Sequence, residues 1–409
     1  MEYQYHTLNN GIKIIHRQIA GTVSHCGLMV NTGSRDEEEN ENGIAHLIEH
    51  LIFKGTNKRK AYHVLSRIEN VGGELNAYTT KEETCIYASF LSQYYNHSLE
   101  LFADVAFNSI FPQKELDKEK DVVIDEINSY NDSPGELIFD DFEDLIFTGH
   151  SLGRNILGSI NNIKSIKRKD ILRFIKSKYS TEQMVIASVG QIKFSKLVLL
   201  AEKYFGCIPA SKNTFSRVSH TSYKPSELVK SKNSYLSHCM IGNIAYSRTH
   251  PNKLPLLLLS NLLGGPALNS RLSMIIREKY GYAYSIESMY QPYSDTGVFN
   301  IYIGADSKHV DKSIALVKKE LINLSTTQLG TMQLHRAKRQ ITGQLAISGE
   351  SFVNEMLGIA KVYLHKPRVK SIEDIIADIE KITSKQILEV AEDIFNPSQL
   401  STLIYTAEG

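Results

Sequence analysis

The segment GIAHLIEHLIFKGT, residues 43–56, places two histidines and a glutamate close together. On a helix, His46 and His50 share one face, with Cβ atoms about 5–6 Å apart. Two neutral imidazoles at this spacing can bind one Zn²⁺ ion, and Glu49 beside them could accept a proton from a water molecule. This H-x-x-E-H order inverts the H-E-x-x-H motif of zinc proteases. The motif alone can also arise by chance on a helix surface.

A catalytic zinc ion takes three protein ligands and leaves one position open, so a third ligand is expected from another element. The segment LDKEKDVVIDEINSYNDSPGE contains Glu119 and Glu126, which are seven residues apart. Two helical turns separate them, so both lie on one helix face near Val122 and Val123. From the residues alone, this face could equally be the boundary between solvent and core.

Strand and helix patterns alternate around these residues. Strands are predicted at 13–15 and 25–30, followed by the acidic segment TGSRDEEENENG (32–43), which we predict to be a solvated loop. After the histidine-bearing helix we expect a helix at 62–71, strands at 74–80 and 84–91, helices at 93–108 and 114–131, and a further helix that begins near Glu136.

The two halves of the chain share one order of elements. A segment that begins at Ser24 and another that begins at Ser237 both contain a strand, a polar loop, an apolar helix and a glycine. Such self-similarity indicates a duplication. We therefore predict an α+β fold with two homologous domains, each an antiparallel or mixed sheet packed with helices.

The two copies differ in the residues that could bind a metal. When the glycines after the two helices are aligned, the positions of His46, Glu49 and His50 are taken by Leu256, Leu259 and Ser260, in that order. A helix that only packs would resemble this second copy. We predict a catalytic zinc-binding domain at 1–212, a linker at 213–234 and an inactive homologous domain at 235–409.

Composition excludes several classes of function. The 409-residue chain has a formal net charge of +1, which gives no field that would attract nucleic acid or an anionic membrane. The longest apolar run, 254–263, is too short to span a bilayer, and no signal peptide is visible. The four cysteines form no CxxC pair and are predicted to be reduced core thiols: Cys26, Cys85, Cys207 and Cys239. We expect a cytoplasmic protein.

With these residues considered together, the chain resembles the M16 family of metallopeptidases, in the subfamily of the mitochondrial processing peptidase β-subunit and its bacterial homologues. In that family a glutamate ligand follows H-x-x-E-H by 76 residues, and Glu126 stands 76 residues after His50. The resemblance implies that His46, His50 and Glu126 bind one zinc ion per chain and that Glu49 is the general base. It also implies a processing-peptidase-like (LuxS-like) fold, with Glu119 supporting the site electrostatically.

The segment GGELNAYTT resembles the edge strand of the family that lies near the zinc. A substrate peptide binds there as an added strand, held by backbone hydrogen bonds whatever its side chains. The resemblance implies that Asn76, Ala77 and Tyr78 lie closest to the substrate.

Two further pairs follow from the resemblance. In IREKYGYAYS, Arg277 and Tyr284 resemble residues that reach the substrate carbonyl from the second domain and stabilise the developing oxyanion, with Tyr282 as an alternative tyrosine. Glu136 and Asp140 correspond to an acidic pair that binds an arginine two residues before the cut. A solvated acidic helix face is the alternative interpretation of this second pair.

We therefore predict a zinc endopeptidase that hydrolyses extended peptides or presequence-like segments in a chamber to which both domains contribute. A homodimer is expected, and a second homologous subunit stays open because the mitochondrial enzyme divides its labour between two chains. The alternatives are a non-catalytic core subunit of the same fold and a peptide-binding protein with a structural zinc. The complete ligand set argues against the first, and Glu49 argues against the second.

Overall fold

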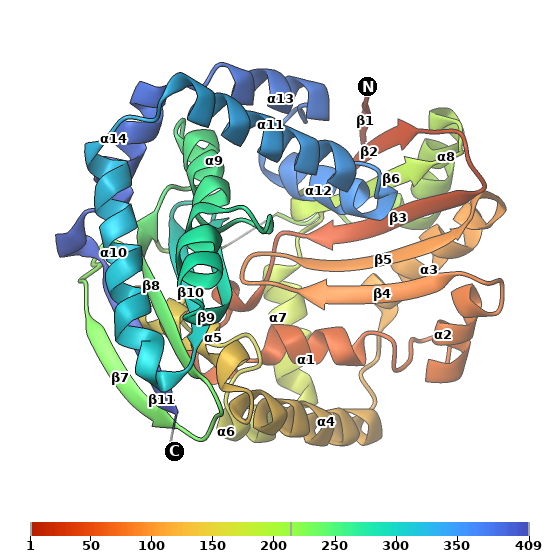
Figure 1. Cartoon of the computed structure of the whole chain (residues 1–409). Helices are drawn as coiled ribbons and strands as arrows, with labels where there is room; N and C mark the ends of the chain where they lie inside the picture. Colours follow the sequence, from red (N-terminus) through yellow and green to blue (C-terminus); the bar gives the residue numbers. More distant parts are fainter. Residues whose placement is uncertain (1, 213–214, 408–409) are drawn as a thin grey trace. The chain divides into compact units, whose positions relative to one another are not determined.

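The computed structural model describes residues 2–212 and 215–407 (Figure 1). The chain divides into two compact units, and each unit includes a segment from the other half of the sequence. Unit 1 consists of Met1–Ile127, Asn155–Arg217 and Ile347–Ser371. Unit 2 consists of Asn128–Arg154, Val218–Ala346 and Ile372–Gly409. The boundaries predicted above follow the sequence halves, whereas these units exchange two helical segments.

Unit 1 contains a six-stranded mixed sheet in the order β1-β2-β6-β3-β5-β4. Its strands are β1 (Gln4–Thr7), β2 (Lys13–Gln18), β3 (Val23–Val30), β4 (Glu74–Thr79), β5 (Thr84–Leu91) and β6 (Met184–Gly190). β2 and β6 are parallel, and the other neighbouring pairs are antiparallel. β4 pairs only with β5, so β4 forms an edge of the sheet.

Helices cover both faces of this sheet. The helices of unit 1 are α1 (Ile44–Leu51), α2 (Ala61–Glu69), α3 (Tyr95–Asn108), α4 (Gln113–Asn131), α6 (Ile160–Ser165), α7 (Arg168–Lys178), α8 (Phe194–Phe205) and α12 (Phe352–His365). Residues of α2, α3 and α8 pack on one face, and residues of α12 pack on the other. Along β3, Cys26 and Leu28 face the first group and Met29 faces α12, because alternate strand residues point to opposite faces.

The histidine-bearing helix α1 belongs to a separate apolar cluster with α4 and α7. Figure 1 shows α1 between β4 and α4, and α1 makes contacts with β4. One side of α1 therefore packs on α7 and on α4, which also carries Glu119 and Glu126, and α1 lies beside the edge strand.

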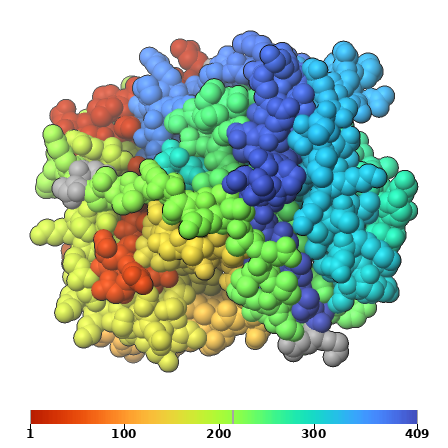
Figure 2. All heavy atoms as spheres, turned by 90° about the vertical axis from the view of Figure 1, so that its left-hand side faces the viewer, coloured from red at the N-terminus to blue at the C-terminus, as the bar shows by residue number. Residues whose placement is uncertain are grey.

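Unit 2 contains a five-stranded sheet in the order β7-β11-β8-β10-β9. Its strands are β7 (Glu227–Lys232), β8 (Ser237–Ala245), β9 (Ala283–Pro292), β10 (Gly297–Ala305) and β11 (Ser401–Ala407). β7 and β11 are parallel and the other pairs are antiparallel. The edge strand β7 is largely exposed, on the face that Figure 2 shows.

The helices of unit 2 are α5 (Pro134–Ile146), α9 (Lys253–Gly264), α10 (Val310–Thr326), α11 (Thr331–Ser348), α13 (Ile372–Glu380) and α14 (Ser384–Ile394). Residues of α5 pack on one face of the sheet, and residues of α9, α10 and α14 pack on the other. β10 is buried along its whole length because both of its faces are covered.

The two units repeat one arrangement, as the duplication predicts. α1 follows β3 and contacts β4, whereas α9 follows β8 and contacts β9. In α9, Leu256 and Leu259 are fully buried and Ser260 is 3% exposed. The α+β prediction of two homologous units, each a mixed sheet packed with helices, is confirmed.

The prediction of a solvated acidic loop at 32–43 is wrong. Within this segment, the buried residues include Ser34, Arg35, Asp36, Glu37, Glu41 and Asn42. Asp36 pairs with Arg217, Glu41 pairs with Arg173, and Arg35 pairs with Glu82, all of them distant in the sequence. A local charge pattern cannot reveal such a partner.

Three further observations bear on the sequence predictions. Residues 213 and 214, at the start of the predicted linker, lie outside the described residues, and Glu227–Lys232 within that linker form β7. Cys26, Cys85 and Cys239 are buried free thiols as predicted, but Cys207, after the end of α8, is exposed. None of the described helices combines the length and apolar character needed to cross a membrane.

Candidate metal centre

Gly43 is the N-cap of α1, and its φ of 97° lies in the left-handed region. A Cβ atom at this position would lie 2.7 Å from both Ile163 Cδ1 and Leu157 O, so the site requires glycine. Ile44, Ala45, Leu47, Ile48 and Leu51 of the helix are completely buried. Burial of these residues leaves His46, Glu49 and His50 to form the polar side of the helix.

Three side chains of unit 1 converge on one point. Glu126 Oε2 lies 3.8 Å from His46 Nε2 and 3.6 Å from His50 Nε2. One ligand atom from each of these residues falls within 4.8 Å of the others. Two imidazoles and one carboxylate form the donor set of a catalytic zinc site with an open fourth position. The residues therefore fit a zinc ion in chemistry and in spacing.

The second nitrogen of His50 has its own partner. His50 Nδ1 lies 3.2 Å from Glu119 Oε2, and Lys54 Nζ lies 2.8 Å from Glu119 Oε1. A carboxylate at one ring nitrogen fixes the tautomer and orients the other nitrogen toward the metal. Glu119 is only 7% exposed, so this contact is sheltered from water. Lys54 is not among the site residues expected from the sequence, although it stands four residues after His50.

Burial shifts the pKa values of two side chains of α1, His46 and Glu49. Burial of His46, together with the neighbouring His50, lowers the pKa of His46 from 6.5 to about 4. At neutral pH this imidazole is therefore uncharged, which is the form that binds metals. Burial raises the pKa of the Glu49 carboxyl, and the neighbouring Thr79 and His50 oppose that shift. A raised pKa brings a carboxylate closer to the optimum of a general base that works near neutral pH.

A cavity of about 300 Å³ opens beside Glu49 and His50. Its lining residues are Glu49, His50, Phe53, Lys54, Leu65, Leu75, Asn76, Ala77 and Glu119. The cavity joins α1 to the edge strand β4, on which Asn76 is exposed and Ala77 and Tyr78 are half-buried. The outer backbone groups of β4 are unpaired with any other described strand, so an extended chain could add there.

The second predicted group of residues lies in unit 2. Arg277 is in a π-helical segment, Ser273–Lys279, and Tyr284 is at the start of β9 with 69% of its surface exposed. Both line a cavity of about 440 Å³ that also includes Gly264 and Gly265. Tyr282 does not line this cavity.

Tyr282 is instead held by stacking. Its ring centroid lies 5.2 Å from that of Tyr280 and 4.6 Å from that of His309. Of the two tyrosines considered from the sequence, Tyr284 is thus the one that lines this cavity.

Glu136 and Asp140 lie one turn apart in the first half of α5. Glu136 is exposed and Asp140 is half-buried. The adjacent Asp141 is occupied by Lys230 Nζ and Tyr405 Oη, each 2.6 Å from its Oδ2. The carboxylates of the predicted pair therefore lie next to an acidic group that already has its own partners.

Comparison with known proteins gives the family. A family model described as Insulinase (Peptidase family M16) matches residues 13–159, and one described as Peptidase M16 inactive domain matches residues 165–341. An uncharacterized zinc protease of Bacillus subtilis, YmxG, is 30% identical over 400 residues, which are 98% of this chain and 97% of that protein. This chain belongs to peptidase family M16.

Other relatives agree with this assignment. The M16 chain is 32% identical to a probable mitochondrial-processing peptidase subunit beta of Schizosaccharomyces pombe, over 95% of this chain and 88% of that protein. Among solved structures, a protease from Helicobacter pylori matches its fold with a TM-score of 0.90 and 22% identity over 99% of both chains. The family and the fold predicted from the sequence are confirmed.

The two family models separate the candidate metal-binding residues from the corresponding residues of α9. His46, Glu49, His50, Glu119 and Glu126 all lie within the first match. The buried leucines and serine of α9 lie within the match described as inactive. Among the described residues, the cluster that could hold a metal ion thus lies within the first match.

Proposed function

We propose that this chain is a zinc-dependent endopeptidase with one zinc ion per chain. The convergence of His46, His50 and Glu126 beside Glu49 supports the proposal most strongly. When bound, a zinc ion would supply Lewis acidity, which polarises a scissile carbonyl and lowers the pKa of a water molecule. Relatives named zinc protease support the choice of metal.

The side chains of unit 1 have distinct roles in this proposal. Glu49 accepts a proton from the attacking water and delivers it to the leaving amine. The Glu119 carboxylate binds the Nδ1 atom of His50, and the Lys54 ammonium group binds Glu119. These contacts keep the imidazole oriented throughout the reaction.

The substrate is proposed to be an extended peptide or a presequence-like segment. Such a chain would add to β4 next to Asn76, Ala77 and Tyr78, because backbone pairing requires no particular side chains. The cavity beside Glu49 has apolar walls at Phe53 and Leu75 that suit an apolar side chain next to the cut. In the proposed chamber, Arg277 and Tyr284 stabilise the negative charge that develops on the carbonyl oxygen.

The Tyr284→Phe substitution is expected to lower kcat/KM by about tenfold or more, because it removes one hydrogen-bond donor to that oxygen. Tyr282→Phe is the matched control, since it removes the same hydroxyl but keeps the stacking with Tyr280 and His309. Steady-state kinetics on one peptide compare the two variants. Equal losses in both variants, or a loss only in Tyr282→Phe, would contradict the assignment.

Glu136 and Asp140 are proposed to bind an arginine two residues before the cut. Since hydrogen bonds to charged groups contribute roughly 1.5–3 kcal/mol, removal of both carboxylates should reduce arginine preference about tenfold or more. Mass spectrometry would map the cuts in unstructured peptides that differ only in this arginine. The zinc-loaded native chain is compared with Glu136→Gln/Asp140→Asn, and with Asp132→Asn as an exposed control in the same unit.

Each result of this mapping has a definite meaning. Cuts that favour arginine only when both carboxylates are present support the endopeptidase and its specificity site. Cuts without arginine preference support the enzyme and leave α5 as a solvated acidic face. If the zinc-loaded chain makes no cuts, either a missing partner subunit or a non-catalytic subunit of the same fold is favoured.

The remaining features concern the setting of the enzyme. A homodimer is proposed. A second homologous subunit is the alternative, because the S. pombe relative is named as a beta subunit. The cytoplasm is the proposed location, and neither nucleic acid nor membrane is a proposed partner of a chain with a net charge of +1.

A further inference from the structure

The segment between β3 and α1 is buried despite its acidic sequence. Ser34 is 0% exposed, Asp36 is 5% exposed and Glu37 is 4% exposed. A buried carboxylate is costly unless other groups satisfy it. The partners of these residues therefore indicate what the segment holds in place.

Glu37 binds the start of the histidine-bearing helix. Its Oε2 atom accepts hydrogen bonds from Asn42 Nδ2 and from the backbone N–H of Gly43, both at 2.9 Å. Its Oε1 atom accepts a hydrogen bond from the backbone N–H of Ala45, also at 2.9 Å. Glu37 thus satisfies N–H groups that a helix start leaves unpaired, and its charge is favourable at the positive end of the helix dipole.

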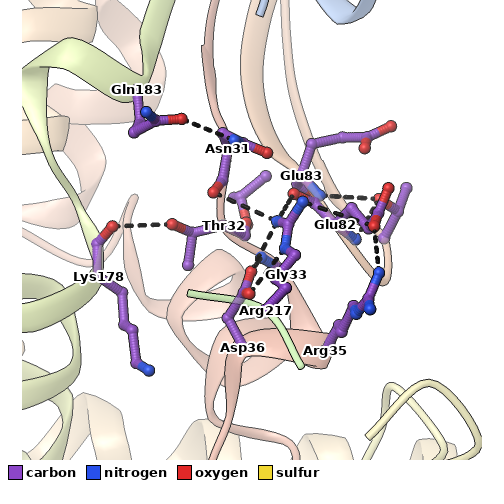
Figure 3. A network of polar contacts seen from close by, with 12 residues as sticks. Asn31, Thr32, Gly33, Arg35, Asp36, Glu82, Glu83, Lys178, Gln183 and Arg217 are labelled. Atoms are coloured by element: carbon purple, nitrogen blue, oxygen red, sulfur yellow. Dashed lines mark hydrogen bonds and ion pairs between the residues drawn. The ribbon is translucent and has the colours of Figure 1, made fainter. Parts of the chain in front are cut away.

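Asp36, the residue before Glu37, is bound by Arg217 rather than by the start of α1 (Figure 3). Arg217 donates from Nε and Nη2 to the two carboxylate oxygens of Asp36, each at 2.9 Å, and from Nη2 to Glu82 O at 2.7 Å. Arg35 Nη1 donates to Glu82 Oε1 at 2.7 Å, and both of these side chains are 1% exposed. Figure 3 shows these side chains gathered around the turn that follows β4.

Backbone contacts complete the attachment. Ser34 N donates to Thr80 O at 3.0 Å, and Arg35 N donates to Lys81 O at 2.8 Å. The segment is thus fixed to the β4–β5 turn on one side and to α1 through Glu37 on the other. The edge strand and the helix that carries His46, Glu49 and His50 are joined through a few buried groups.

The helix α1 has eight residues, and a helix of this length is marginal without outside support. Any shift of its first turn moves both histidines and the base relative to Glu126, which lies on another helix. We infer that Glu37 is a positioning residue, whose carboxylate fixes the start of α1 so that the metal ligands and Glu49 are preorganised. This inference deepens the proposed function and rests on it for the role of Glu49.

The Glu37→Gln substitution tests the inference. The amide keeps the shape of the side chain, but it removes the charge and directs an NH₂ group at donors of Asn42, Gly43 or Ala45. We expect the affinity for zinc, measured at 25 °C by competition with a chromophoric chelator, to fall about tenfold. We also expect kcat to fall while KM changes less than about twofold, and the visible spectrum of the cobalt-substituted protein to shift.

Two other variants separate positioning from general stability. Glu355→Gln removes another buried carboxylate of unit 1, which bonds Tyr3 and Arg17 and lies on α12, whose apolar residues belong to a different cluster from those of α1. It should lower the melting temperature and leave zinc affinity and the cobalt spectrum unchanged. Glu37→Asp keeps the charge on a shorter side chain and should retain part of the zinc affinity. If the glutamine variant does not fold, the aspartate variant carries the test.

Native zinc affinity, kcat and cobalt spectrum in Glu37→Gln would overturn the inference. An equal loss of zinc affinity in Glu355→Gln would overturn it as well, because the effect would then be general destabilisation. Failure of the proposed function is a separate result, namely a zinc-loaded native chain that cleaves no peptide. In that case the zinc affinity and the cobalt spectrum still decide whether Glu37 positions the ligands.

Discussion

Glu49→Gln is expected to lower the turnover of peptides by about 10²–10⁴-fold while the chain keeps its zinc. Glutamine matches the shape of glutamate but cannot accept the proton of the attacking water. His46, His50 and Glu126 are untouched, so the ligand set is intact. Metal analysis and peptide turnover would be measured on the same purified sample.

Glu69→Gln is a matched control, since Glu69 is an exposed residue at the end of α2 in the same unit. This control should retain both zinc and turnover. If Glu49→Gln keeps native turnover, Glu49 is not the general base. If it loses zinc as well as turnover, Glu49 contributes to metal binding and the division of roles proposed here is wrong.

His50→Ala is expected to weaken zinc binding by more than about 100-fold and to remove peptide turnover. Loss of an outer partner of a metal ligand already costs about 10–100-fold in affinity, and His50 is proposed as a ligand itself. The substitution also leaves Glu119 without the imidazole that lies 3.2 Å away. Chelator competition measures the affinity.

The control is His63→Ala, which removes an exposed imidazole from α2. Its zinc affinity should equal that of the native chain. A native zinc affinity in His50→Ala would place the metal somewhere other than the cluster of His46, His50 and Glu126.

The helical part of the site could be predicted from local sequence. The spacing of His46 and His50 follows from helix geometry, and the structure confirms a helix at Ile44–Leu51. Glu126 could not be assigned from its own surroundings, because a helix face with carboxylates and valines also suits a solvent boundary. Its assignment needed the family spacing, and the structure brings it within 3.6 Å of His50.

Pairs of residues that are distant in the sequence could not be predicted from local sequence patterns. Arg217 binds Asp36 across 181 positions, and this pair turns an apparently solvated loop into a buried one. The helices α5 and α12 each pack on the sheet of the unit formed mainly by the other half of the chain. No local pattern in either helix specifies which sheet will receive its apolar face.

The most direct test of zinc-dependent catalysis is peptide hydrolysis by one native preparation at three stages. The chain is assayed when loaded with zinc, after zinc has been removed by a chelator, and after zinc has been returned, with Glu49→Gln treated in parallel. We predict that native activity is present, then lost, then restored, and that the variant is inactive at every stage. Two results would contradict this prediction: a native chain with one zinc per molecule that leaves peptides intact, or hydrolysis that continues undiminished without zinc.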